Sequence, residues 1–327
     1  MHNRWLTSTL FVLKRVASLL VSLFLASIII FLVLRLLPGD SSASLGVGAT
    51  QDQLEQLRKE LGTNQPLWTQ YWNWLRDLLT GQSESFVSRM PFGELISHRL
   101  TITVPLSVTA FLVSVLISTP IGIIAATKRK SPIGLIVSGA SQLGLAVPVF
   151  WVGVILVWIF ALHLGWFPSG NFPRQGWSDP AAAFRALVLP VVTIAIAMSA
   201  TMIRFVRSSV IDVLEADYMR TARSLGYSRT QALVRHGLRN ATVPVVAILG
   251  IELGTSLLGA VVIENVFALP GLGQLLLTSV QARDLPVVQN LVMLLTAVVL
   301  VLNTVVDLIQ RAIDPRLQFG NSRGGAS

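Results

Sequence analysis

Six apolar runs, each about twenty residues or longer, constrain this chain more than any other feature of its sequence. They cover residues 16–37, 101–126, 133–163, 186–205, 243–267 and 287–309. Because a helix rises about 1.5 Å per residue, runs of this length cross a hydrocarbon core roughly 30 Å thick. With 53% hydrophobic and 13% charged residues, the chain is predicted to be an all-α polytopic membrane protein with six transmembrane helices.

The first apolar run follows Arg4, Lys14 and Arg15. It is longer than the apolar core of a typical signal peptide, so we expect a retained transmembrane helix; a cleaved signal peptide is the alternative. Several later runs contain prolines, which membrane helices tolerate where neighbours satisfy the freed carbonyls, and which we expect to kink helices around a central feature: Pro105, Pro120, Pro148 and Pro190. In the fifth run, Gly250-x-x-x-Gly254 permits close helix approach.

A polar region at 38–100 separates the first run from the second. Residues 50–53 (TQDQ) form a capping box, and a leucine stripe at 54, 57 and 61 predicts a helix that ends at Gly62. Pro66 opens a second predicted helix. Its apolar residues suit either a helix at the headgroup level or a soluble helical hairpin, and both readings stay open: Trp68, Tyr71, Trp72, Trp74, Leu75 and Leu78.

The basic residues predict the orientation of the spans. If the N-terminus is cytoplasmic, the inside segments are 1–15, 127–132, 204–240 and the C-terminal tail, and they hold most of the Lys and Arg that lie outside the spans. The segment 38–100 has more acids than bases, and the loops near 164–185 and 268–286 hold only Arg174, Arg185 and Arg283. Under the positive-inside rule, both termini are expected in the cytoplasm of a bacterial inner membrane.

The cytoplasmic element at 215–244 is too polar to cross a bilayer and too regular for a linker. Tyr218, Ala222 and Leu225 recur at helical spacing, and Gly226 offers the left-handed position at which helices end. Residues 228–231 (SRTQ) form a capping box for a second helix. The pattern predicts an apolar face that enters the groove of a protein partner, while arginines steer an acidic rim; binding to anionic lipid is the alternative.

Enzyme chemistry finds little support in the sequence. The sequence contains no Gly-x-x-x-x-Gly-Lys-Ser/Thr phosphate loop and no cysteine. The histidines at 2, 98, 163 and 236 are too scattered for a zinc site. Ser141 sits in a motif like that of intramembrane proteases, but His163 is poorly placed to share its proton. We therefore expect no catalytic, metal-binding or cofactor-binding residues in this chain. We also expect that any energy its function needs is supplied from outside the chain.

Two acids lie within or at the edge of the fifth run. Glu252 is a candidate to line a translocation path together with Ser256, although the competing reading, a hydrogen-bonded packing carboxylate, is the more ordinary role for such a residue. Glu264 precedes a turn that contains Pro270, Gly271 and Gly273, and it is predicted to accept backbone amides of that external turn.

Several motifs together resemble a known family. Residues 217–226 (DYMRTARSLG), 236–241 (HGLRNA) and Pro244 are similar to the cytoplasmic loop signature of the binding-protein-dependent permeases of ABC importers. Further matches to the first permease subunit of dipeptide, oligopeptide and nickel importers are 36–40 (LLPGD), 264–273 (ENVFALPGLG) and 283–289 (RDLPVVQ). Arg220-Thr221-Ala222 stands where the general signature has Glu-Ala-Ala, as in the peptide branch.

The resemblance implies a type I importer transmembrane domain, organised as 1–100 (first helix and external helical region), 101–311 (five helices) and a cytoplasmic tail at 312–327. It implies a second permease subunit, two ATPase subunits that bind ATP and Mg, an external solute-binding protein and surrounding lipid, but no nucleic acid. The implied ATPase-coupling residues are Asp217, Tyr218, Arg220, Thr221, Ala222, Arg223, Leu225 and Gly226. Dipeptide, oligopeptide, nickel chelate, opine or glutathione all remain open as solutes, and a stand-alone transporter or channel is the alternative function.

Overall fold

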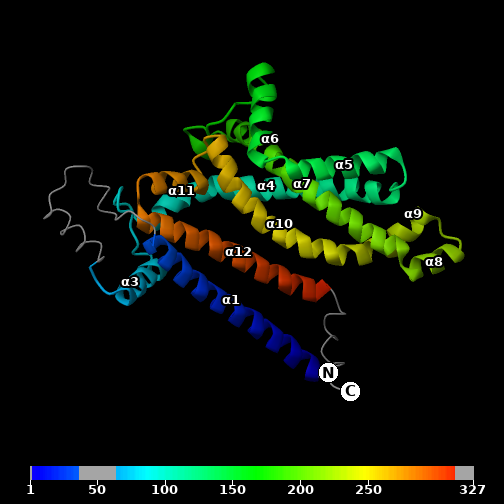
Figure 1. The fold of residues 1–327 in the computed structure, drawn as a ribbon, viewed down its shortest axis with the longest axis horizontal. Coiled ribbons are helices and arrows are strands. Elements are labelled where there is room, and N and C mark those ends of the chain that lie inside the picture. The colour runs from blue at the N-terminus through cyan, green and yellow to red at the C-terminus, as the bar shows by residue number, and fades with distance from the viewer. Residues whose placement is uncertain (1, 37–63, 314–327) are drawn as a thin grey trace. The chain divides into compact units, whose positions relative to one another are not determined.

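The computed structural model describes residues 2–36 and 64–313, and these ranges are almost entirely helical (Figure 1). Apart from an isolated bridge between Glu84 and Pro91, they contain no β-structure. Within these two ranges, five helices are long and apolar enough to cross a membrane, and the count is six when one bent pair is taken as a single span. This confirms the predicted all-α membrane fold. The predicted helix that ends at Gly62, with its capping box, lies outside the described residues.

The chain divides into two compact units, Met1–Ile102 with Pro270–Val301, and Thr103–Leu269 with Leu302–Ser327. The first unit contains α1 (His2–Leu36), α3 (Leu67–Thr80), the start of α4 (Phe92–Thr127), α11 (Leu272–Gln281) and the start of α12 (Leu285–Ile313). The second contains the rest of α4 and of α12 and the helices that lie between residues 132 and 266. This division into two units does not test the predicted domain boundaries, which stay a prediction.

Helix α3 begins directly after Pro66, as predicted, and packs by its aromatic face on α1. The Tyr71 ring meets Phe31 edge-on with centroids 5.5 Å apart. The Tyr71 hydroxyl also shares a hydrogen bond of 2.8 Å with the Ser27 hydroxyl. Trp68 and Trp72 are exposed. The buried contact explains why this helix carries so many rings on one side, and the exposed tryptophans keep the headgroup reading open.

The loop between α3 and α4 is held by two polar side chains near the start of α12. Asn290 accepts the indole N–H of Trp74 at 2.8 Å and donates to the Ser83 hydroxyl at 2.5 Å. Asp284 accepts bonds from Ser85 and from two backbone amides of the same loop. Both Asn290 and Asp284 are buried, so the loop is bound through satisfied polar groups.

In the second unit, α7 (Pro180–Glu215) is the most buried of the candidate spans, since 72% of its most apolar 18-residue stretch is buried. It packs against α5 (Pro132–Ala146), α6 (Val149–Leu156) and α10 (Leu238–Val266). Close approach depends on small residues: a Cβ at Gly122 of α4 would lie 2.7 Å from Val206 of α7. Pro190 lies buried within continuous α7 and does not end this helix.

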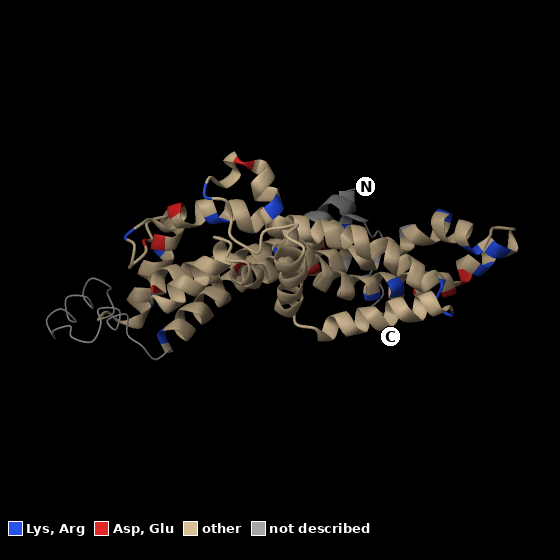
Figure 2. Ribbon diagram, turned by 90° about the horizontal axis from the view of Figure 1, so that it is seen from above, with Lys and Arg blue, Asp and Glu red and all other residues tan. Residues whose placement is uncertain are grey.

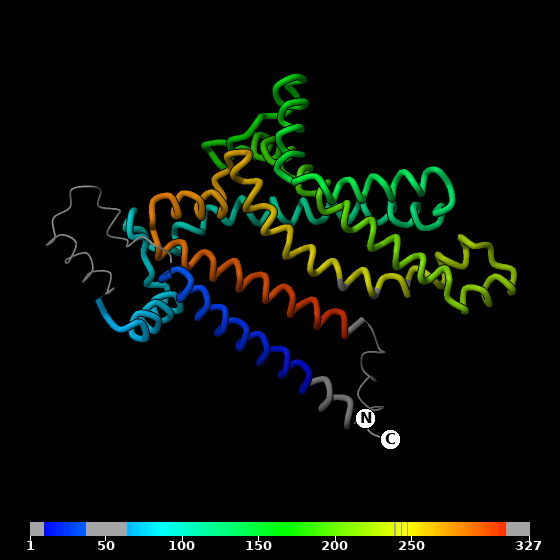
Figure 3. Tube along the Cα trace, in the orientation of Figure 1, coloured from blue at the N-terminus to red at the C-terminus, as the bar shows by residue number. Residues whose placement is uncertain are grey.

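The predicted span 133–163 is not one continuous helix. It divides into α5 and a second segment, α6 with the π-helix η2 (Val157–His163), and the two axes differ by 101° (Figure 3). Pro148 has no amide for the helix ladder and disfavours helical geometry in the preceding residue, and Val147 takes φ −87° and ψ 123°. Pro148 is thus a break, whereas Pro105 and Pro120 lie inside continuous α4.

Candidate functional site

The element at 215–244 begins where α7 ends. Ala216 has extended backbone (φ −65°, ψ 146°), and α8 (Asp217–Ser224) follows it. Gly226 has φ +93°, the left-handed conformation expected of it. The Ser228–Gln231 capping box is present in both directions, at 3.1 and 3.2 Å, and starts α9 (Arg229–Ala232). The predicted helix, glycine corner and helix are therefore confirmed. The second helix is short and continues through the π-helix η4 (Leu233–Gly237) into α10.

Helix α8 has a buried and an exposed apolar side. Met219 is 1% exposed and Ala222 is 6% exposed, and both join a core with Val210 of α7 and Leu233. Tyr218 and Leu225, in contrast, are 40% and 74% exposed. The prediction that Ala222 belongs to the outward face is therefore wrong, because Ala222 lies with Met219, at i and i+3, on the side facing α7. Met219 was missed, although that spacing to Ala222 could have indicated it.

Basic residues surround the exposed side of α8. Figure 2 shows several Lys and Arg residues gathered at this end of the second unit. Arg220 lies 3.6 Å from Asp217 in an exposed i, i+3 pair, and the Thr221 hydroxyl donates to the Asp217 carbonyl at 3.3 Å. A cavity of about 220 Å³ beside α8 is lined by Arg129, Leu214, Met219, Arg220, Arg223 and Arg229.

Arg129 was not predicted as part of this element, because it lies in the turn between α4 and α5. Its guanidinium contacts the Glu215 carboxylate at 2.5 Å, which joins that turn to the last residue of α7. In the sequence, Lys128, Arg129 and Lys130 indicated only the cytoplasmic side. No pattern within either segment indicated that they would meet, since the contact joins residues far apart in the chain.

The two path candidates both lie inside the second unit. Glu252 is 8% exposed, and the Thr255 hydroxyl lies 3.4 Å from its carboxylate. Ser256 is fully buried and donates to the Leu253 carbonyl at 2.7 Å. Both candidates thus have hydrogen-bond partners within their own helix. Their role in a path stays a prediction.

Glu264 is fully buried near the end of α10. Its carboxylate accepts the Thr103 hydroxyl at 2.5 Å, and its backbone carbonyl accepts the Leu269 amide at 2.8 Å. The chain then turns through Ala268, which has φ +49°. Pro270 follows, and Gly271 is the N-cap of α11, whose second residue is Gly273. The predicted turn therefore connects α10 with α11. That the Glu264 carboxylate accepts the backbone amides of this turn stays a prediction.

The described residues contain no group of three or more His, Cys, Asp or Glu side chains able to hold a metal ion. The charged groups that the structure brings together are basic, at the corner formed by α8, α9 and the α4–α5 turn. Such an arrangement suits contact with a partner better than bond-breaking chemistry.

Comparison with known proteins identifies the family. Residues 118–319 match the binding-protein-dependent transport system inner membrane component, and residues 9–107 match its N-terminal component. The chain is 37% identical over 311 residues to the glutathione transport system permease protein GsiC of Escherichia coli (strain K12), covering 94% of this chain and 99% of the relative. It is 38% identical, with the same coverage, to GsiC of Salmonella choleraesuis (strain SC-B67).

Two solved structures share the fold. The methionine ABC transporter MetNI, in an inward-facing conformation, superposes with a TM-score of 0.54 at 18% identity, over 67% of this chain and 96% of the other. An amino acid ABC transporter solved with histidines gives a TM-score of 0.53 at 20% identity, over 68% and 95%.

These matches support a subunit of an importer and not a stand-alone transporter or channel. Members of this family are non-enzymatic membrane components, and ATP hydrolysis takes place in partner subunits. The chain belongs to the family of binding-protein-dependent transport system inner membrane components, and it is a multi-pass permease subunit of an ATP-driven importer of the peptide and nickel branch.

Proposed function

We propose that the exposed side of α8, with Tyr218 and Leu225 framed by Arg220 and Arg223, is the surface through which an ATPase subunit acts on this permease. The observation that supports this most is the division of α8 into two sides. Its inner side, Met219 and Ala222, is packed in the core at the end of α7, while its outer apolar residues, Tyr218 and Leu225, are exposed. Force applied to α8 would therefore reach the most buried helix of the unit.

The complete importer on this proposal contains a second permease subunit, two ATPase subunits and an external solute-binding protein. ATP and Mg would bind to the ATPase subunits, and this chain would need no cofactor of its own. Closure of the ATPase pair would displace α8 and favour one of two arrangements of the spans. The proposal includes both termini on the cytoplasmic side, since the basic segments favour that orientation.

We further propose a short peptide, with glutathione as the first compound to test, as the solute. The support is the identity of 37% to permeases named for glutathione transport. Glu252 and Ser256 would contact the solute once the helices rearrange. The Glu252→Gln variant tests this: a changed preference between glutathione and a neutral dipeptide in uptake assays is expected, and an unchanged preference would remove Glu252 from the path.

The coupling surface is tested by Gly226→Asp in the complete importer reconstituted in vesicles. An aspartate at φ +93° strains the corner and adds an anion beside the arginines. We expect uptake to be lost and ATPase activity to become independent of the loaded binding protein, with normal amounts of permease in the membrane.

Gly81→Asp is the matched control. Gly81 also has a left-handed backbone (φ +72°), follows a helix and has open space around its Cβ position, but it lies after α3 in the first unit. The backbone strain is therefore similar, and only the location differs. Normal uptake by Gly226→Asp, or equal uncoupling by Gly81→Asp, would contradict the proposed role of α8.

A further inference from the structure

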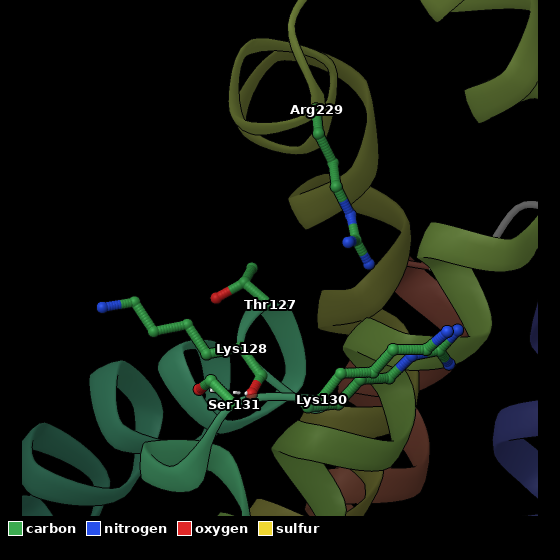
Figure 4. Close-up of a pocket in the computed structure, with 6 residues that line it drawn as sticks. Thr127, Lys128, Lys130, Ser131 and Arg229 are labelled. Carbon is green, nitrogen blue, oxygen red and sulfur yellow. Dashed lines mark hydrogen bonds between the residues drawn. The ribbon is translucent and has the colours of Figure 1, made fainter.

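A second basic cavity lies next to the proposed coupling surface, on the side of α9. It has a volume of about 470 Å³ and is lined by Thr127, Lys128, Arg129, Lys130, Ser131 and Arg229. These six residues, here called the basic pocket, come from the α4–α5 turn and from the first residue of α9. The Arg229 side chain extends from its helix toward that turn (Figure 4).

The α4–α5 turn that forms most of the basic pocket is tightly built. Ser131 is the N-cap of α5, accepts the Gly134 amide at 3.4 Å and donates to the Lys128 carbonyl at 2.8 Å. A Cβ at Gly134 would overlap that same carbonyl, so a larger residue would open the turn. The Arg129–Glu215 ion pair, at 2.5 Å, fixes the turn to the end of α7. The side of the pocket formed by the turn is thus held by specific contacts.

The charge of the basic pocket is incompletely balanced. Four of the six lining residues are cationic and none is acidic. Arg129 pairs with Glu215, whereas Lys128, Lys130 and Arg229 form no ion pair within the described ranges 2–36 and 64–313. Like charges gathered around one cavity repel one another and create a positive potential inside it. An anion in the cavity would remove this cost.

The lining groups favour a phosphate over a carboxylate. A phosphate presents several oxygens in a tetrahedral arrangement and can accept bonds from cations on opposite walls, as the turn and α9 provide here. The pocket also lies where two candidate spans end, since α4 ends at Thr127 and α7 at Glu215. Basic residues at such ends meet anionic lipid headgroups. We propose that the basic pocket binds a phosphate group, carried by an anionic phospholipid or by a soluble phosphate compound.

The test uses the full-length chain purified in neutral detergent. The pocket variant combines Lys128→Gln, Lys130→Gln and Arg229→Gln and leaves the Arg129–Glu215 pair intact. The control combines Arg174→Gln, Arg204→Gln and Arg235→Gln, which removes the same charge from exposed positions outside the pocket. Circular dichroism and elution volume establish that each variant is folded, and the single variant Arg229→Gln provides a milder change.

Native mass spectrometry measures retained dioleoylphosphatidylglycerol against dioleoylphosphatidylcholine, and calorimetry measures inorganic phosphate. We expect wild type and control to retain the anionic lipid or phosphate, and the pocket variant to bind about tenfold more weakly. A loss confined to phosphatidylglycerol identifies the lipid source, and a loss of phosphate binding identifies a soluble source. The proposal is overturned if the pocket variant and the control bind both probes equally.

Discussion

The Ser85 hydroxyl donates to the Asp284 carboxylate at 2.5 Å, which joins the α3–α4 loop to the connection before α12 within the first unit. The same carboxylate accepts the backbone amides of Phe86 at 3.1 Å and Val87 at 3.3 Å. One buried aspartate therefore holds three donors of this loop, in addition to the bonds that the loop forms within itself, such as that from the Arg89 amide to the Ser85 carbonyl at 3.0 Å.

Replacing Asp284 is expected to release this loop. Asp284→Asn keeps the size of the side chain but removes its charge and one acceptor oxygen, so we expect a loss of about 1.5–3 kcal/mol in local stability. Hydrogen exchange at the amides of Phe86 and Val87 provides the measurement. Ser85→Ala is the control, since it removes one donor and leaves both amide bonds. Unchanged amide exchange in Asp284→Asn would show that the carboxylate does not hold the loop.

Gly250 is expected to be intolerant of any side chain. A Cβ at Gly250 of α10 would overlap Val306 of α12, within the second unit. Gly250→Ala should therefore destabilise the chain by about 1–3 kcal/mol through overpacking, seen as a lower melting temperature in detergent. Val306→Ala in the same chain should restore part of that loss. Gly139→Ala, in α5 with open space at its Cβ, should be neutral or stabilising; equal effects at both glycines would refute the contact.

The hydrogen bond from Thr103 to Glu264 is expected to stabilise the second unit at least as much as a buried bond to a backbone carbonyl does. Both side chains are fully buried, and the donor–acceptor distance is 2.5 Å. Thr103→Val should cost about 1.5–3 kcal/mol in unfolding free energy. Thr193→Val is the comparison, because the fully buried Thr193 hydroxyl donates to the uncharged Leu189 carbonyl at 2.7 Å. A smaller effect at Thr103 than at Thr193 would argue against a special role for Glu264.

The proposed orientation can be measured without removing any native thiol, because the sequence has no cysteine. Ser224→Cys, at the exposed end of α8, should resist a membrane-impermeant maleimide in intact cells and react in inverted vesicles. Ser178→Cys, in the exposed loop before α7, should show the reverse. The opposite labelling of both sites would place the basic corner outside and would also defeat the proposed contact with an ATPase.

Local signals in the sequence were sufficient wherever a few neighbouring residues decide the structure. Gly226 ends α8 because only its backbone adopts φ +93° at little cost, and the Ser228–Gln231 box forms from side chains within one turn. Long apolar runs likewise identify spans, since lipid requires every backbone group to bond within its own helix.

Contacts between distant segments could not be predicted in the same way. The burial of Ala222 depends on where α7 and Leu233 lie, since within α8 Ala222 has an apolar neighbour on either side, Tyr218 four residues and Met219 three residues before it. The Arg129–Glu215 ion pair joins two segments far apart in the chain. In the sequence, Arg129 indicated only which side of the membrane its turn occupies. A proline also has two outcomes: Pro190 is enclosed by packed neighbours and continues its helix, while Pro148 ends one.

The break at Pro148 has a consequence for assembly. Each segment on either side of it, Pro132–Ala146 and Val149–His163, has 15 residues, and at about 1.5 Å per residue neither reaches across a bilayer alone. Pro148 has no amide to offer the Gly144 carbonyl, and irregular backbone at membrane depth is stable only against protein or water. Phe150, Trp151 and Trp158 beyond the break are exposed, so we expect that packed neighbours, and not lipid alone, are needed to accommodate the freed carbonyl of a span divided in this way.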